Sequence, residues 1–420
     1  MRLSHIGWNL AGLSLPLLVA AVTVPHLIAK LGNERFGLLA LAWGLIGYAG
    51  ALDLGIGRAL TQMVARLRGD GNVSVIPDAL ATARRITLIA GLVGGVAITL
   101  VAFVGVSAWI GAKATSPAEI RNAMLLLAIA LPAQAMSATF RGLNEAYLNF
   151  KGISLVRVGL GIVNFGGPYL VTLYTTQLPW LVATLVVSRL LALMIYRRLA
   201  YMCFDEQPGI QRKGIYSPPI ARSLFSFGGW ITVSSVVGPI LTQADRFMVA
   251  SVLSAAMVTI YVLPYEVVVQ SLILVGAVSS VIFPTLSRLM HEQPDRWQAY
   301  FRRWLLAVAA MMLVVCALLA LLLPMLLPLW IKTNLQPESI VVGQILCLGV
   351  FANAIGTMYY ALLHAKGRSD LTAKLHLIEL PIFIGALVIL LNQYGIEGAA
   401  WAWVGRAVFD AIFLKILSRS

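Results

Sequence analysis

The sequence predicts an all-α polytopic membrane protein with about twelve transmembrane helices in two parallel six-helix halves around a central cavity. Of the 420 residues, 60% are apolar and only 11% are charged, and the mean hydropathy is +0.87. Since soluble domains carry about 25% charged residues, too few polar side chains are present to cover a water-exposed surface. The apolar residues also fall in long blocks of about 20 residues, and basic residues alternate between the connecting segments.

The first six apolar blocks form the predicted N-terminal half. They lie at about Trp8 to Ala29, Phe36 to Val64, Ile86 to Ala112, Asn122 to Phe140, Ile153 to Tyr174 and Pro179 to Tyr196. The first block follows Arg2, as the apolar part of a secretion signal would. Its length exceeds the roughly 7 to 15 apolar residues of such a signal, and no small-residue cleavage site follows it. We therefore expect it to be a retained membrane span.

A polar segment rich in linker residues separates the two halves. It predicts an N-terminal half at residues 1–202, a cytoplasmic linker at 203–223 and a C-terminal half at 224–420. The later spans lie at about Leu224 to Val249, Val258 to Leu286, Trp304 to Ile331, Ile340 to Leu363, Leu375 to Leu391 and Gly395 to Ile416. Because each half has an even number of spans, the halves are expected to be parallel repeats.

The distribution of Lys and Arg predicts the orientation in the membrane. With the N-terminus inside, the inner segments hold 22 basic residues and the outer loops hold five. Basic residues concentrate on the cytoplasmic side of membrane proteins, so both termini are expected in the cytoplasm. The net charge of +14 is then mainly cytoplasmic-loop charge. It favours contact with anionic membrane lipids and gives no indication of nucleic acid.

Composition and spacing argue against an enzyme with a separate catalytic domain. Twelve spans use about 240 residues, and the remaining segments are too short for a domain of about 100 residues. The cysteines show no CxxC spacing, and the five histidines show no HExxH pairing. We expect no cofactor and no metal.

Charged side chains inside apolar spans are the candidate functional residues, because each costs several kcal/mol in hydrocarbon. They are Asp53 and Arg58 in the second span, Arg189 in the sixth, Asp245 and Arg246 in the seventh, Glu266 in the eighth, Glu379 in the eleventh, and Arg406 and Asp410 in the twelfth.

Two of the arginines leave alternatives open. Arg189 lies about 12 Å along its helix from the interfacial Arg197. It either pairs with a carboxylate or carbonyl on another helix or faces an anion-binding cavity. Asp245 and Arg246 leave their helix about 100° apart, so one can face a cavity while the other is paired. Arg406 and Asp410 are four residues apart, and we predict that they pair with each other.

The carboxylates are candidates for ion coupling. Asp53 precedes two glycines that permit close helix approach or a local break. Glu266 and Glu379 each lie two residues from a proline, where a disrupted helix frees backbone carbonyls. Such sites suit a proton or a sodium ion, and a structural hydrogen bond at the kink is the alternative.

Several ordered motifs carry a family resemblance. They are Trp8-Asn9 with Pro16 and Pro25, the segment Leu31 to Leu38, Tyr48 with Asp53 to Ala59, Arg141 to Ala146 with Phe150, Asp245-Arg246, Tyr261 with Pro264 to Glu266, and Phe283 to Ser287. In this order and spacing the chain resembles Wzx-type polysaccharide flippases of the MOP exporter superfamily, and the resemblance runs from end to end.

The resemblance implies transport of an undecaprenyl-pyrophosphate-linked oligosaccharide across the bacterial cytoplasmic (inner) membrane by alternating access. Arg58, Arg189 and Arg246 would then bind the pyrophosphate, because the planar guanidinium matches phosphate oxygens and stays charged. Asp53, Asp245, Glu266 and Glu379 would be the candidates for coupling to a proton or sodium gradient. Besides the lipid-linked oligosaccharide, the expected partners are membrane lipids and a polysaccharide polymerase.

Two other functions are weighed against this one. A cation-coupled multidrug or small-solute exporter of the same superfamily would need acidic groups for cationic drugs, which the deep arginines disfavour. A membrane-embedded polymerase, ligase or acyltransferase would need long external loops or a catalytic cluster at one face, and the predicted external loops are short.

Overall fold

The computed structural model describes residues 3–49, 53–105, 110–205, 213–292, 296–332, 335–366 and 368–418. These residues form 12 α-helices and no strand. Among them, nine helical stretches are long and apolar enough to cross a membrane. The predicted all-α polytopic class is therefore confirmed.

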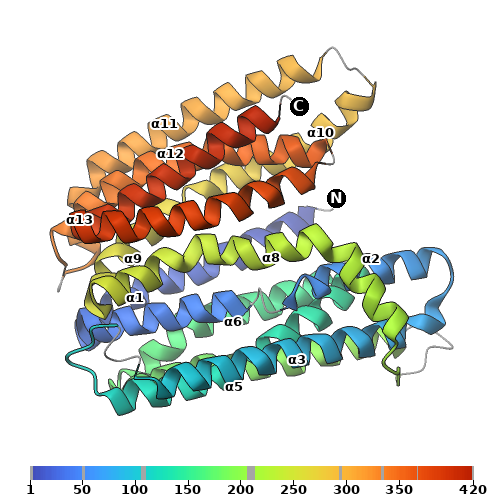
Figure 1. Ribbon diagram of the computed structural model, residues 1–420, viewed down its shortest axis with the longest axis horizontal. Helices are drawn as coiled ribbons and strands as arrows, with labels where there is room; N and C mark the ends of the chain where they lie inside the picture. The colour runs from blue at the N-terminus through green and yellow to red at the C-terminus, as the bar shows by residue number, and fades with distance from the viewer. Residues whose placement is uncertain are drawn as a thin grey trace. The chain divides into compact units, whose positions relative to one another are not determined.

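The chain divides into two compact units, residues 1–239 and 240–420. The first unit holds α1 (Leu3–Ala49), α2 (Ile56–Gly69), α3 (Ile76–Phe103), α5 (Pro117–Ala146), α6 (Phe150–Val171), α7 (Leu178–Asp205) and the first part of α8 (Pro218–Val252). Within it, α5 packs against α3 and α7, and α1 packs against α6 (Figure 1).

Helix α1 consists of two helices joined at Gly32, whose φ of +70° suits glycine. His26 packs against Tyr169, and Trp43 packs against Phe165 four residues away on the same helix, α6. In a straight helix His26 and Trp43 would be about 25 Å apart along the axis. The chain therefore reverses at Gly32, and α1 supplies the first predicted span and the first part of the second.

The second predicted span is not one continuous helix. Helix α1 ends at Ala49 and α2 begins at Ile56. Between them Leu54 and Gly55 have φ values of +52° and +71°, and the Asp53 carboxylate accepts a hydrogen bond of 2.9 Å from the Gly55 backbone nitrogen. The short side chain of aspartate favours such a turn. Of the two predicted uses of the glycines, the local break is therefore present here.

The second unit holds the rest of α8 and five further helices. They are α9 (Ala255–Val269), α10 (Leu272–Glu292), α11 (Trp297–Trp330), α12 (Glu338–Ala365) and α13 (Ser369–Leu417). Helix α12 packs against α11 and α13. The predicted eighth span is divided between α9 and α10. Helix α13 contains Gly395 at a φ of +58°, where two helices join, so α13 corresponds to the two last predicted spans.

The helix ends revise the predicted boundaries of two elements. The third span was expected to begin at Ile86, but α3 begins at Ile76. Helices α7 and α8 extend into the predicted linker, and the short segment before α8 is anchored on α3. There Ile215 donates its backbone N–H to the Asp78 carboxylate at 2.7 Å. The division at residues 202 and 224 stays a prediction.

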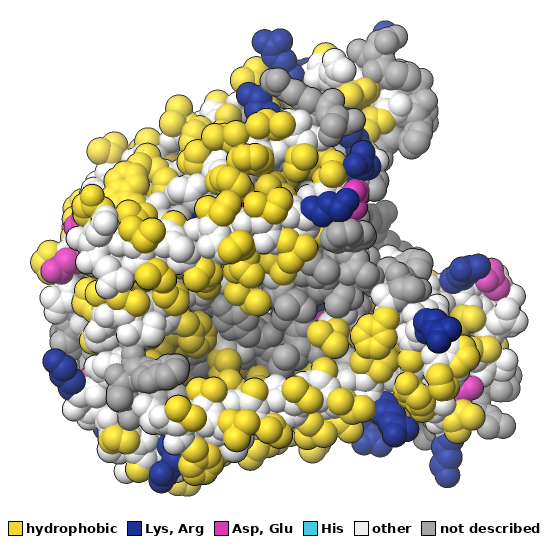
Figure 2. All heavy atoms as spheres, in the orientation of Figure 1, with side chains coloured by type: hydrophobic (Ala, Val, Ile, Leu, Met, Phe, Trp, Pro, Cys, Tyr) yellow, Lys and Arg dark blue, Asp and Glu magenta, His cyan; other side chains and the backbone are white. Residues whose placement is uncertain are grey.

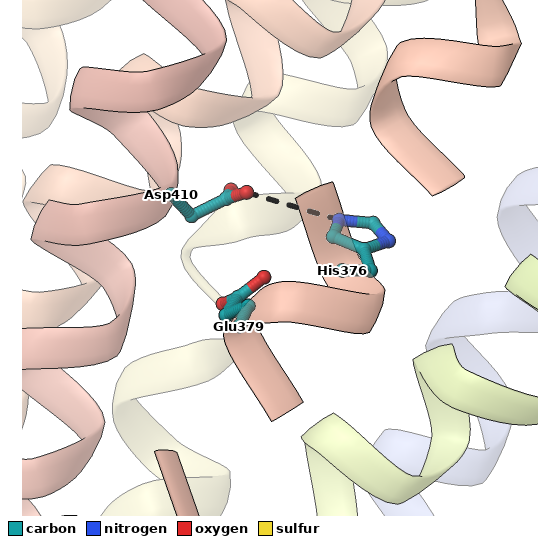
Figure 3. A group of neighbouring side chains, drawn as sticks. All are labelled: His376, Glu379 and Asp410. Atoms are coloured by element: carbon teal, nitrogen blue, oxygen red, sulfur yellow. Dashed lines mark ion pairs between the residues drawn. The ribbon is translucent and has the colours of Figure 1, made fainter. Parts of the chain in front are cut away.

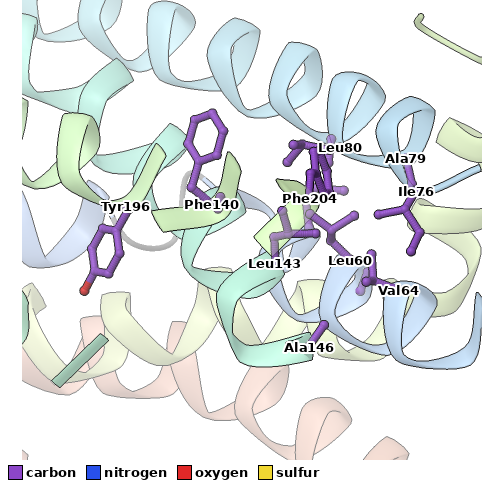
Figure 4. Packing of buried hydrophobic residues seen from close by; sticks show 14 of the residues in the cluster. Leu60, Val64, Ile76, Ala79, Leu80, Phe140, Leu143, Ala146, Tyr196 and Phe204 are labelled. Carbon is purple, nitrogen blue, oxygen red and sulfur yellow. The ribbon is translucent and has the colours of Figure 1, made fainter. Parts of the chain in front are cut away.

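The interior and the exterior are both apolar. A cluster of buried side chains from α2, α3, α5 and α7 includes Leu60, Ile76, Phe140 and Phe204 (Figure 4). On the face shown in Figure 2, apolar side chains predominate among the described residues, and Lys and Arg lie mainly toward the edges of the view. A contiguous apolar exterior on long helices is the surface expected of a protein in contact with lipid.

Candidate functional site

Arg189 in α7 makes its polar contact with a neutral partner. Its guanidinium donates to the side-chain oxygen of Asn164 on α6 at 3.1 Å, and the Asn164 backbone oxygen accepts from the Trp43 indole at 3.1 Å. The Arg189 Nε is buried and has no partner. Among the described residues no carboxylate pairs with Arg189, so its charge is not neutralised. Of the first predicted alternative, a carboxylate or carbonyl on another helix, the described residues supply a side-chain carbonyl oxygen on α6; the anion-binding cavity stays a prediction.

Asp53 and Arg58 flank the break before α2. Asp53 is buried within the turn that it stabilises, while Arg58 is exposed in the first turn of α2. The positive charges of Arg141 and Arg58 act on the Asp53 carboxylate. Asp53 therefore has a structural bond and two basic neighbours, and Arg58 is accessible.

Asp245 and Arg246 diverge to different partners, as their angular separation on α8 requires. The fully buried Asp245 accepts from the Tyr261 hydroxyl at 2.7 Å. The Arg246 guanidinium donates to Glu266 at 2.6 Å and lies 5.1 Å from the centre of the Tyr265 ring. Arg246 is thus paired with a carboxylate, and Glu266, whose side chain is 45% exposed, is the accessible member of that pair.

The predicted pairing of Arg406 with Asp410 is wrong. Arg406 instead donates to Glu379 at 3.1 Å, and Asp410 lies 3.7 Å from His376 Nε2. Glu379 and His376 are on the first half of α13, and both of their partners are on the second half. The reversal at Gly395 makes these pairings across the hairpin possible, and they replace the pairing along one helix.

Sequence reasoning missed three participants: Asn164, Tyr261 and His376. The spacing of the histidines along the chain contains no metal-binding motif, so spacing alone does not indicate His376. The available signal was weaker: His376 and Glu379 are three residues apart on one helix face, inside an apolar span that also holds Pro381. For Asn164 and Tyr261 no spacing in the sequence points to the partner helix.

Charged groups held inside apolar membrane helices mark candidate paths for polar or ionic substrates. Solved structures share this polytopic helical fold. The chain superimposes on an inward-facing multidrug resistance MATE family transporter of the MOP superfamily with a TM-score of 0.74 at 14% identity, covering 98% of this chain and 97% of that chain. It also superimposes on a MOP superfamily transporter from Pyrococcus furiosus with a TM-score of 0.63 at 16% identity, covering 99% and 93%.

The sequence comparisons define the family. The model of the polysaccharide biosynthesis protein family matches residues 3–290, and the chain belongs to this family. A Shigella flexneri protein named for O-antigen transport is 27% identical over 411 residues, which cover 98% of this chain and 96% of the relative. The lipopolysaccharide biosynthesis protein WzxC of Escherichia coli K12 is 24% identical over 405 residues, covering 92% and 74%. These relatives confirm the resemblance that the sequence motifs indicated.

Proposed function

We propose that this protein is a flippase that moves an undecaprenyl-pyrophosphate-linked oligosaccharide from the inner to the outer leaflet of the bacterial cytoplasmic membrane. The single observation that carries the proposal is Arg189, a cation inside an apolar helix whose described partner is a neutral amide. Family membership and the names of both curated relatives, which concern O-antigen and lipopolysaccharide, support the same cargo class.

The cargo explains the need for such a cation. A lipid-linked pyrophosphate carries concentrated negative charge that must cross an apolar layer, and its transfer costs less where a fixed positive charge replaces water. Arginine suits this role because its guanidinium remains protonated and binds phosphate oxygens in a forked geometry. Arg189 is the main pyrophosphate ligand in this proposal. Arg58 is exposed and is the second proposed pyrophosphate ligand. Arg246 becomes a ligand when its bond to Glu266 is broken.

The cycle is alternating access by the two six-helix halves, driven by a proton or sodium gradient. The polyprenyl tail stays in lipid while the headgroup passes through the protein. Glu266 and Glu379 are the foremost coupling candidates because each is bonded to an arginine, so that cation binding and arginine release can be exchanged. Asp53 and Asp245 are engaged in bonds that hold a turn and a tyrosine, and their part in coupling is secondary.

The proposed orientation places both termini in the cytoplasm. It follows from the excess of basic residues in the predicted inner segments. A reporter enzyme active only outside the cytoplasm, fused after Ser418, should be inactive, whereas fusion within the loop between α11 and α12 should be active. The opposite pattern would reverse the topology.

A polysaccharide polymerase on the outer face is the expected partner that receives the cargo.

The proposal is tested by depleting the protein in cells that express no second flippase and extracting the lipids. We expect an undecaprenyl-pyrophosphate oligosaccharide to accumulate in the cytoplasmic leaflet while surface polysaccharide is lost, and its sugars would identify the cargo. Normal surface polysaccharide without a lipid intermediate would contradict the proposal and favour a multidrug or small-solute exporter.

A further inference from the structure

A cluster of four ionisable side chains lies inside the second unit, within helix α13. His376 and Glu379 come from its first half, and Arg406 and Asp410 come from its second half. Figure 3 shows His376 and Glu379 on neighbouring turns, with Asp410 across from them. Each of these three offers one ligand atom, and the three atoms lie within 4.8 Å of one another. In a straight helix His376 and Asp410 would be about 50 Å apart, so the cluster depends on the Gly395 reversal.

The bonding of the cluster is incomplete. Glu379 is 1% exposed and Asp410 is 9% exposed. One oxygen of Glu379 accepts from Arg406, but the other has no hydrogen-bond partner among the described residues, and neither do Oδ1 of Asp410 and Nδ1 of His376. Buried polar atoms without partners are uncommon in proteins and destabilise the folded state. Three such atoms on neighbouring side chains are available to bind one further cation.

The charges of the cluster do not balance. Two carboxylates face a single guanidinium, and a neutral His376 leaves one net negative charge in an apolar helix pair. The charges on α8 do not supply the deficit, because Arg246 is paired with Glu266 and lies beside Asp245. A single added positive charge would make the cluster neutral, which lowers the cost of keeping it out of water.

The remaining neighbours contribute aromatic rings and one further histidine. From α12, Tyr360 lies 6.3 Å from the His376 ring and 4.2 Å from the His364 ring. The Arg406 guanidinium lies 5.5 Å from the Trp403 ring and 5.6 Å from the Phe383 ring. The Arg406 charge also acts on Tyr265 of α9 and on Asp245 of α8. Neither α9 nor α12 adds a cation that is permanently charged.

The chemistry of the donors selects a proton over a metal ion. Sodium and magnesium prefer all-oxygen ligands, whereas this site includes an imidazole. A divalent transition metal suits imidazole, but two positive charges would leave the cluster with a net charge of +1 beside Arg406. A single proton shared by His376 and Asp410 gives neutrality. It also allows a charge-assisted hydrogen bond of about 2.7–2.9 Å to Asp410, in place of the present separation of 3.7 Å.

We propose that His376 and Asp410 hold the coupling proton of this transporter, beside the Arg406–Glu379 ion pair. The role of this proton in driving transport rests on the proposed function, whereas the presence of the proton site does not. Binding of the proton draws together the two halves of the α13 hairpin, and its release separates them. The site thereby links a cation on one side of the membrane to a movement within the second unit.

The proton site is tested without any cargo, by nuclear magnetic resonance of the protein labelled with 15N-histidine and reconstituted in lipid nanodiscs. The signal absent in His376→Gln identifies His376. We expect this signal to change between pH 8 and pH 5, as the His376–Asp410 pair takes up one proton. In Asp410→Asn, which keeps the side-chain volume, the transition should move by about one pH unit or more to lower pH, because the carboxylate that stabilises the imidazolium is gone. His26→Gln in the first unit, as a control, should leave it unchanged.

Three outcomes would overturn the assignment. The first is a His376 signal that does not change with pH throughout this range. The second is a His376 signal that responds at constant pH to sodium, and the third is one that responds to zinc, which would make the cluster a metal site. A transport assay separates this inference from the proposed function. If His376 titrates with Asp410 but the protein flips no lipid-linked oligosaccharide, the proton site stands and the flippase function fails.

Discussion

The two units hold their membrane-embedded arginines in opposite ways. In the first unit Arg189 bonds to the neutral amide of Asn164. In the second unit Arg246 and Arg406 each bond to a glutamate, and two aspartates lie beside them. The first unit therefore has a positive charge without a carboxylate, whereas the second has more carboxylates than arginines. This difference suggests a division of labour, with anion binding in the first unit and cation coupling in the second.

The largest expected effect on stability comes from breaking the buried pair of the second unit. Glu379→Ala leaves the Arg406 guanidinium, whose side chain is 8% exposed, without its carboxylate. Removing one partner of a buried ion pair costs about 3–5 kcal/mol. Thermal unfolding in detergent should show a large loss. The control Glu338→Ala changes an exposed carboxylate in the first turn of α12 and should unfold like the wild type. Equal stability of both variants would mean that the Glu379–Arg406 pair does not stabilise the folded state.

The second prediction concerns transport and uses one substitution to give Arg189 the carboxylate partner that it lacks. Asn164→Asp places a carboxylate against Arg189 and makes the first unit resemble the second. We expect transport to fall at least about tenfold, because the carboxylate competes with the cargo phosphate for the guanidinium. Stability should be retained. Asn164→Ala removes the hydrogen bond but leaves the charge available, and should keep substantial transport. Equal transport by the Asp and Ala variants would refute competition for Arg189.

A smaller effect is expected from packing next to the α13 cluster. A Cβ atom at Gly349 of α12 would lie 2.5 Å from the Trp403 ring, and this ring lies against Arg406. Gly349→Ala should therefore destabilise the protein by about 1–3 kcal/mol and alter the His376 signal. In Gly385→Ala the added atom meets nothing within 4 Å. This control should leave the signal in place, and matching spectra from both variants would show that the ring does not support the cluster.

The smallest effect on transport is expected next to Asp245. Tyr261→Phe removes the hydroxyl that donates to its buried carboxylate, at an expected cost of about 1–3 kcal/mol. Because Asp245 also accepts from the Arg246 backbone nitrogen, we expect the fold and proton-dependent transport to persist. A complete loss of proton dependence in this variant, with transport retained, would shift the coupling site from His376 to Asp245.

The spans could be predicted because a membrane-crossing helix depends on local properties, namely the length and the hydropathy of one block of residues. The helix break at Asp53 was also foreseeable, since two glycines follow an aspartate that can cap a turn. The partners of charged residues were not foreseeable in the same way. Arg406 has an acid four residues away, yet it bonds to Glu379 across the hairpin, because the reversal at Gly395 sets which faces meet.

His376 is a second residue whose partner could not be predicted from local spacing. Within the first half of α13 only Glu379 lies on its face as a charged neighbour, so the local spacing indicated no site. Its role depends on Asp410, which is more than thirty positions along the chain and is brought near by one glycine with a positive φ. Asn164 is similar, because an asparagine inside an apolar helix becomes informative only once Arg189 is known to lie beside it.

The most direct test of the central claim is the flipping rate of a fluorescent undecaprenyl-pyrophosphate oligosaccharide in proteoliposomes, followed by dithionite quenching of the outer leaflet. The variants are Arg189→Ala, Arg189→Lys and, as a control on the same helix, Arg198→Ala, which alters an exposed arginine. We predict background rates for Arg189→Ala, partial rates for Arg189→Lys and wild-type rates for Arg198→Ala. Wild-type flipping by a correctly folded Arg189→Ala protein would contradict the account.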